Sequence, residues 1–109
     1  MPLDKHSRAV RRVADLELSV QNNHDGRRVR FIRDQLGLNQ AQFAKFIGVS
    51  VQSVNTWENN KTPLSLHGAR LIKAKTDYGL DFLIDGDTAS FSASQRIAWS
   101  DWLERASST

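Results

Sequence analysis

The sequence predicts an all-α fold in which five short helices enclose one core, with an additional helix at each end of the chain. Two observations indicate this. Apolar residues recur three and four positions apart in successive segments, the spacing that gives a helix one buried face. Most segments also begin after a helix-capping residue, and several end at glycine. We expect an N-terminal helix or arm (1–24), a bundle domain (25–86), and a linker with a C-terminal helix (87–109).

The N-terminal segment is expected to form a helix over about 4–19. Three arginines lie on its other faces, and both a solvated face and a phosphate-contacting arm account for them. The apolar stripe favours docking on the core or on a partner chain. It consists of Leu3, Val10, Val13, Leu16 and Val20.

The first helix of the bundle is expected over 26–36, with Asp25 as its N-cap and Gly37 as the residue that ends it. Leu38 is expected to close over the end of this helix. Asn39 then caps the next helix, and Gln42 three residues later completes a capping box. The buried stripe of the first helix is expected to be Val29, Ile32 and Leu36.

The central segment, Gln40–Asn59, is expected to form two short helices joined by a tight turn. Gly48 ends the first of them, because glycine adopts a positive φ without steric cost. Ser50 caps the second. The outer face of the second helix carries only neutral side chains that form hydrogen bonds, whereas a solvated face more often carries Lys and Glu. Such side chains are able to pair with base edges or phosphates. They are Gln52, Ser53, Asn55, Thr56 and Asn59.

Three further helical segments are expected after the central one. Thr62 and Pro63 predict a helix start, and this helix runs to about Lys75. A single helical turn follows over 81–84, and Ser94 is expected to cap a final helix over about 95–106. The core of the bundle is expected to contain Ile32, Leu36, Phe43, Ala44, Ile47, Val49, Val54, Trp57, Leu71, Ile72, Leu80 and Leu83.

The final helix carries an apolar stripe with two tryptophans, which a short terminal helix cannot bury alone. Tryptophan is enriched at interface hot spots, so we favour self-association through this stripe. Docking back onto the helix's own domain is the alternative. The candidate dimer interface consists of Trp99, Trp102, Leu103 and Ala106.

Charge is unevenly distributed along the chain, although its net value is only +3. Residues 38–76 hold five Lys or Arg and one Asp or Glu, whereas residues 77–109 hold two and six. The basic excess therefore surrounds the central segment, and the acidic excess lies in the tail. A cationic module attracts polyanions, of which duplex DNA is the densest available.

The run Val29–Gly86 resembles the phage repressor and Cro family of helix-turn-helix regulators. The resemblance rests on IRDQLGLNQAQFAKFIGVSVQSVNTWENNKTPL and on GLDFLIDG, and it covers a little over half of the chain. It implies a five-helix bundle whose second central helix enters the DNA major groove. Asn60 stands where the family commonly has glycine, and asparagine tolerates the left-handed conformation that this turn needs.

The resemblance also implies a role for individual residues. Arg33 and Glu58 match a charge pair that ties the first bundle helix to the base-reading helix. Val51 departs from the more usual polar residue, and we expect it to touch a thymine methyl group. The positions facing base edges are Val51, Gln52, Asn55 and Thr56, and those expected at phosphates are Asn39, Gln40, Ser53, Asn59 and Lys61.

Nothing in the sequence indicates an enzyme, a metal or a cofactor. The three histidines are scattered without metal-ligand spacing, and no serine lies in a nucleophile-elbow motif. The chain has no cysteine, and no apolar run approaches the ~18 residues of a membrane span. Because no secretory signal is evident, we expect a cytoplasmic protein associated with the nucleoid.

Two functions follow as hypotheses. The first is a sequence-specific, dimeric repressor that binds a palindromic operator in double-stranded DNA. The second is an antitoxin-like protein, whose tail helix would mask a toxin or another protein partner such as an antirepressor, with autoregulatory DNA binding. The Trp99 and Trp102 stripe and the Trp57–Glu58 dipeptide are also consistent with the second hypothesis.

Overall fold

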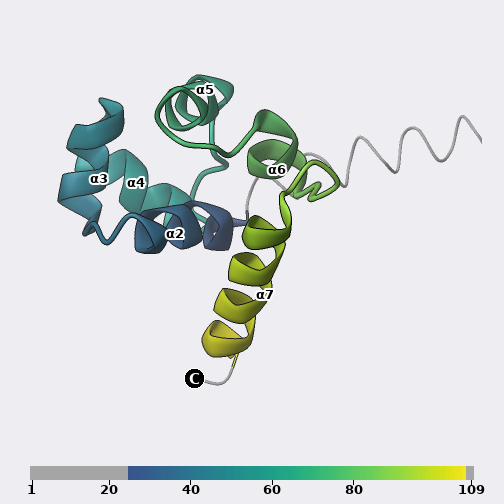
Figure 1. Cartoon of the computed structure of the whole chain (residues 1–109). Helices are drawn as coiled ribbons and strands as arrows, with labels where there is room; N and C mark the ends of the chain where they lie inside the picture. The colour runs from purple at the N-terminus through teal and green to yellow at the C-terminus, as the bar shows by residue number, and fades with distance from the viewer. Residues whose placement is uncertain (1–24, 108–109) are drawn as a thin grey trace, which may run out of the picture.

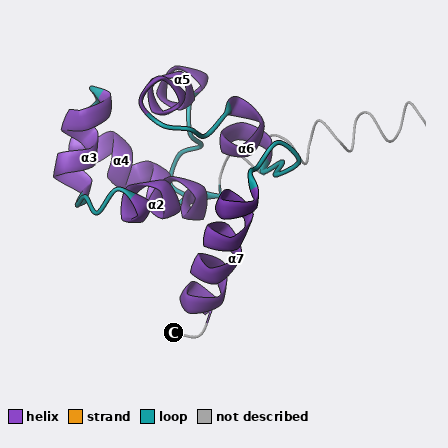
Figure 2. Cartoon of the chain, viewed as in Figure 1, coloured by secondary structure: helices purple, strands orange, loops and turns teal. Residues whose placement is uncertain are grey.

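In the computed structural model of the chain, residues 25–107 are described, and every regular element among them is a helix (Figures 1 and 2). The predicted N-terminal helix over about 4–19 lies outside the described residues. The central helices α3 and α4 pack against α2 and α5, and α7 extends from the α6 side past α2 (Figure 1). The helices are α2 (Gly26–Gln35), α3 (Gln40–Ile47), α4 (Val51–Glu58), α5 (Leu66–Lys75), α6 (Leu80–Asp85) and α7 (Ala93–Ser107).

Helix α2 begins and ends where its capping residues predict. The Asp25 carboxylate accepts a hydrogen bond from the backbone N–H of Arg27. Gly37 has a φ of +69°, and the N–H of Leu38 reaches back to the carbonyl of Arg33. This closure ends the helix in the way that a left-handed glycine permits.

The prediction that Leu36 belongs to the core is wrong, because its side chain is 41% exposed. Leu36 follows the last residue of α2 and lines an open cavity of about 440 Å³ together with Ile32 and Tyr78. Ile32 and Val29, one and two turns earlier on the same stripe, are fully buried. The end of the stripe therefore extends beyond the packed core.

The start of α5 differs from the prediction, which placed Thr62 as its N-cap and Pro63 at its first position. The helix begins at Leu66, and Ser65 is the N-cap, because its hydroxyl accepts from the N–H of Gly68 at 3.0 Å. Leu64 is buried at 3% exposure, which holds the preceding residues out of the helix. Thr62 instead bonds to Thr56, so this turn completes α4 rather than starting α5.

Helix α7 begins slightly earlier than predicted, and Ser94 is not its cap. The Ser92 hydroxyl accepts from the N–H of Gln95, and the Gln95 side chain accepts from the N–H of Ser92. These reciprocal bonds form a capping box, which requires the glutamine three residues after the serine. Only Ser92 satisfies that spacing with Gln95.

Helix α7 docks on its own domain through an aromatic cluster centred on Phe31 of α2. The Phe31 ring lies 4.9 Å from that of Trp99 and 5.9 Å from that of Trp102, in edge-on arrangements. The indole N–H of Trp102 donates to the Asp34 carboxylate at 2.9 Å. The structure thus shows the docking alternative for Trp102, which is buried on its own domain. Trp99 and Leu103 are half-buried, and Ala106 is exposed.

The core forms around the helices as the apolar spacing predicts. Of the predicted members, Val49, Leu71 and Leu80 are half-buried at the margin of the core. The prediction is confirmed for the buried members Ile32, Phe43, Ala44, Ile47, Val54, Trp57, Ile72 and Leu83. Val29, expected on the buried stripe of the first bundle helix but not in this core list, is also buried. The buried apolar residues that neither prediction included are Phe31, Leu64, Ala69, Phe82, Phe91 and Trp102.

A buried arginine joins α2 to α6. Arg28 is 3% exposed, and its guanidinium donates to the backbone carbonyls of Phe82 and Leu83 at 3.3 and 3.0 Å. The Phe82 carbonyl also accepts from the N–H of Gly86. The Leu83 carbonyl lies in the last turn, where helical partners are lacking, and Arg28 supplies its donor. The charge on α2 therefore stabilises the end of α6.

Candidate nucleic-acid interface

Local capping signals position α3 and α4 as the sequence predicts. The Asn39 side chain accepts from the N–H of Gln42, and the Gln42 side chain accepts from the N–H of Asn39, which completes the capping box. Gly48 has a φ of +88° and ends α3, and the Ser50 hydroxyl accepts from the N–H of Ser53 to start α4. Two short helices are thereby joined by a turn of three residues, and the turn sets the angle between them.

The residues predicted to face base edges divide into two groups. Val51 is 49% exposed, and the Gln52 side chain is exposed and forms no hydrogen bond within the described part of the chain. Asn55 and Thr56 are half-buried, and both are engaged by the protein. The Thr56 hydroxyl donates to the carbonyl of Ser53 and accepts from the Thr62 hydroxyl. The side chains in the first turn of α4 are therefore more exposed, and less engaged by the protein, than Asn55 and Thr56.

A buried carboxylate anchors α4 to α2. The side chain of Glu58 is 0% exposed, and its two oxygens accept from Arg33 at 2.7 and 2.9 Å in a bidentate pair. Arg33 also donates to the carbonyl of Leu38, just before α3. The charge pair implied by the family resemblance is therefore present, and it connects α2, α4 and the turn that leads into α3.

Two further side chains bond to Glu58, and neither role was predicted from the sequence. The Arg30 guanidinium lies 3.4 Å from the carboxylate and is 48% exposed, and the Gln40 amide donates to it at 3.1 Å. Arg30 lies one turn before Arg33, so helical spacing would have placed it on the same face of α2. The bond from Gln40 depends on how closely α3 approaches α4, which the sequence does not indicate.

The surroundings of Glu58 favour its charged form. Burial alone raises the pKa of its carboxyl, but the hydrogen bonds from Arg33, Gln40 and Arg30, together with the charge of Arg33, outweigh burial and hold the pKa below its usual value. At neutral pH the group is thus a carboxylate, which only accepts hydrogen bonds.

Acid is expected to destabilise the fold through this carboxylate. Because the pKa of Glu58 is lower in the folded chain than in the unfolded one, its stabilising contribution is present above the unfolded value of about 4.3 and is lost as the pH falls through the folded value. Melting temperatures measured between about pH 7 and 3 should decline below about pH 4.3. Glu58→Gln should decline less over that interval, since other carboxyls titrate in both proteins. Equal declines would contradict this role.

The turn after α4 is hydrogen-bonded to the start of α2. Asn60 has a φ of +58°, as expected for the residue that replaces the common glycine, and its side chain accepts from the N–H of Gly26 at 2.7 Å. A Cβ on Gly26 would overlap the backbone carbonyls of Trp57 and Glu58. Glycine at this position is therefore required for the close approach of α2 to the end of α4.

The residues predicted at phosphates lie at the ends of α3 and α4. Lys61 is exposed and forms no ion pair with a described carboxylate, and Asn39 and Asn59 are exposed while their side chains bond locally. Ser53 is half-buried beside Ser50, and the Gln40 amide is bonded on both sides. Gln40 retains one N–H for a phosphate.

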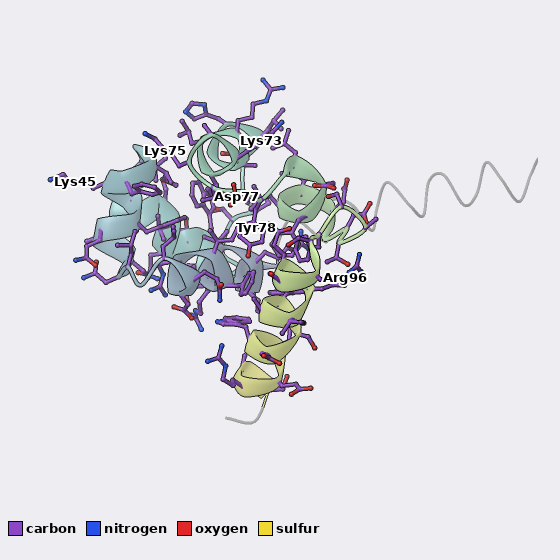
Figure 3. The ribbon with its side chains drawn as sticks, viewed as in Figure 1. Lys45, Lys73, Lys75, Asp77, Tyr78 and Arg96 are labelled. Atoms are coloured by element: carbon purple, nitrogen blue, oxygen red, sulfur yellow. The ribbon has the colours of Figure 1, made fainter. Side chains whose placement is uncertain are left out.

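Three lysines of α3 and α5 lie away from α7. Lys45 on α3 and Lys73 and Lys75 on α5 project from the side of the bundle opposite α7, where Arg96 lies (Figure 3). Helices α6 and α7 carry most of the acidic residues of the tail. The basic side chains therefore accompany the central helices, as the charge distribution along the sequence predicts.

The described residues contain neither a membrane-spanning helix nor a metal-binding cluster. Among residues 25–107, no helix combines the length and apolar character needed to cross a membrane. The described part also holds no group of three or more His, Asp or Glu side chains arranged to bind a metal ion.

Comparison with known families assigns the same segment. A family model described as helix-turn-helix matches residues 29–83, which is half of the chain. The match includes all of α3, α4 and α5 and most of α2 and α6. Neither the curated proteins nor the solved structures gave a match.

Proposed function

Because the chain belongs to the helix-turn-helix family of the phage repressor and Cro type, whose members are DNA-binding transcription regulators, we propose that it is a dimeric repressor that reads a palindromic operator with α4 in the major groove. The observation that carries the proposal is the anchoring of α4. Its inner face is fixed by the buried Glu58 pair, while Val51 and Gln52 remain exposed. A rigidly held helix with exposed side chains is suited to direct readout of base edges.

The phosphate contacts supply affinity and register. Lys61, Asn39 and Asn59 are exposed at the ends of the two central helices, where backbone contacts would fix the protein on the duplex. Helix-turn-helix domains are regulatory rather than catalytic. A repressor acts where the DNA is, so we place the protein in the cytoplasm, in association with the nucleoid.

The dimer would present two copies of α4 to successive major grooves, about 34 Å apart. Since Trp102 is buried on its own domain, the contacts between chains would come from the parts of the candidate interface that are still accessible, namely Trp99, Leu103 and Ala106. Light scattering of the free protein and of the operator complex tests the stoichiometry.

The antitoxin-like alternative receives less support from the described residues. It depends on a tail helix whose tryptophans are free to mask a toxin or an antirepressor. Trp102 instead packs against Phe31 and bonds to Asp34. No feature of the described surface favours such a partner, so the repressor is the function that we propose.

Selection of binding sites from random double-stranded DNA tests the proposal. We expect an enriched motif made of two inverted half-sites, with centres about one helical turn apart. Binding should weaken steeply with salt, because phosphate contacts release counterions. Absence of any enriched sequence would refute sequence-specific regulation by this chain.

Gln52→Ala is expected to lose readout at one base pair of each half-site. The Gln52 side chain is exposed in the first turn of α4 and forms no hydrogen bond within the described structure, so its truncation to alanine should leave the fold intact. Discrimination at that base pair should fall by about 1–3 kcal/mol, measured by competition among single-base operator variants. Uniform weakening across all variants would assign Gln52 to the backbone instead.

Lys61→Ala is expected to weaken binding to all sequences alike. The ammonium group lies on the turn after α4, where a phosphate contact is expected. Loss of one such contact in each half-site should reduce the slope of log affinity against log salt by about one per half-site, or about two for the dimer. An unchanged slope in fluorescence-anisotropy titrations would place Lys61 outside the interface.

A further inference from the structure

A continuous path of hydrogen bonds leads from the buried carboxylate of Glu58, through Gln40 of α3, to Asn55, which lies one turn before Glu58 on the same helix, α4. The Gln40 Nε2 donates to Glu58 Oε1 at 3.1 Å, and the Gln40 Oε1 accepts from Asn55 Nδ2 at 3.1 Å. Glu58 is enclosed, whereas Gln40 and Asn55 are half-buried. We refer to Glu58, Gln40 and Asn55 as the amide relay.

The chemistry of the relay determines which way each amide faces. A carboxylate offers only acceptors, so Gln40 has to present its NH₂ group to Glu58. Its oxygen is then the atom that faces Asn55, and Asn55 has to present its own NH₂ group in return. Turning either amide over would set two acceptors or two donors against each other in a half-buried site, which is costly.

The relay leaves defined atoms of Asn55 for a ligand. Asn55 Oδ1 accepts no hydrogen bond from any residue in the described structure, and Nδ2 retains one N–H after bonding to Gln40. The side chain therefore offers an acceptor together with one donor. An asparagine without such a partner would be free to turn over and offer either edge.

We propose that the buried carboxylate of Glu58 sets the polarity of the Asn55 amide through Gln40, so that Asn55 selects a base with an amino group in the major groove, adenine in particular. The proposal rests on the function proposed above. In the major groove, adenine N6 and cytosine N4 are donors, whereas guanine and thymine present only acceptors and the thymine methyl group. Adenine also places the N7 acceptor beside its amino group, and this pair matches the two remaining sites of Asn55.

The test compares base preferences of the wild-type chain and four variants by selection from random duplex DNA and by competition with single-base variants. Asn55→Ala identifies the position read by Asn55, where the wild-type chain should prefer adenine by roughly tenfold. In Glu58→Gln the new amide is able to donate or accept, so the relay loses its polarity. The adenine preference at that position should fall to about twofold or less, while the ranking of bases elsewhere is retained.

Arg33→Lys is the matched control. It disrupts the same bidentate pair but keeps the carboxylate, so affinity should fall for all sequences while the adenine preference is retained. Circular dichroism establishes that each variant is folded. Gln40→Ala removes the bridge and leaves the Arg33–Glu58 pair intact, so it should relax the preference at the Asn55 position even where Glu58→Gln does not fold.

Each outcome bears either on the amide relay alone or on the proposed function as well. A wild-type motif in which Asn55→Ala affects a guanine or thymine position would overturn the relay and leave the proposed regulator standing. The same holds if the adenine preference survives in Gln40→Ala and in folded Glu58→Gln, or is lost equally in Arg33→Lys. If the wild-type chain enriches no sequence at all, both the relay and the proposed function are overturned.

Discussion

Arg33→Met is expected to lower the free energy of unfolding by about 3 kcal/mol or more, because removing one partner of a buried ion pair leaves the other charge uncompensated. The Glu58 side chain is fully enclosed, and Arg33 supplies its two shortest hydrogen bonds. Arg30 and Gln40 would retain contact, which places the loss at the lower end of the usual range. Urea denaturation followed by circular dichroism measures the loss.

The control for Arg33→Met removes both charges. In Arg33→Met/Glu58→Met, no carboxylate remains without its partner. The free energy of unfolding should therefore return most of the way from the Arg33→Met value to the wild-type value. The recovery separates the cost of a buried, uncompensated charge from the cost of lost packing. A double variant no more stable than Arg33→Met would contradict this explanation. A single variant as stable as the wild-type chain would show that the pair does not anchor α4.

Trp102→Ala is expected to lower the free energy of unfolding by about 3–5 kcal/mol, the range for removing a large buried aromatic side chain. Trp102 is 7% exposed, lies 5.9 Å from Phe31 between ring centres, and stacks on Trp99 at 5.8 Å. Its loss would open the aromatic cluster between α2 and α7. The loss is measured by thermal and urea denaturation followed by far-ultraviolet circular dichroism. This signal is preferred to fluorescence because the substitution itself removes a fluorescent tryptophan.

Two matched variants separate the contributions to α7 docking. Trp102→Phe keeps a ring but loses the bond to Asp34, and it should cost about 1 kcal/mol from that bond in addition to a smaller packing loss. Ile97→Ala lies on the same helix at 62% exposure and should change stability by less than about 0.5 kcal/mol. If Trp102→Ala were as mild as Ile97→Ala, α7 would not be docked on its own domain in solution.

The central helices were predictable because their boundaries are decided locally. The capping box at Asn39, the left-handed glycine at 48 and the serine cap at 50 all act over three or four residues, and the bounds of α3 agree with the prediction. The start of α5 was not predictable in this way. Thr62 with Pro63 and Ser65 are both good start signals, and the burial of Leu64, a tertiary effect, selects the second.

The candidate site was predictable only in part, for a similar reason. The resemblance correctly paired Arg33 with Glu58, whose contact joins residues 25 positions apart. It did not indicate that Gln40 bonds to both Glu58 and Asn55, because that bond depends on the distance between α3 and α4. Likewise, helical spacing identified the tryptophan stripe of α7, but only the packing against Phe31 shows where Trp102 is buried.

The position of α4 on DNA is the claim on which the proposed function depends, and the absence of cysteine from the chain allows it to be tested directly. A DNA-cleaving iron chelate is attached to Thr62→Cys, on the exposed turn that follows α4, and in a control to Arg96→Cys, on α7. On the selected operator, the Thr62→Cys conjugate is expected to cut within a few base pairs of each half-site centre, at two symmetric positions, and the Arg96→Cys conjugate is not. Cleavage scattered along the duplex, or the same pattern from both conjugates, would contradict the placement of α4 in the major groove.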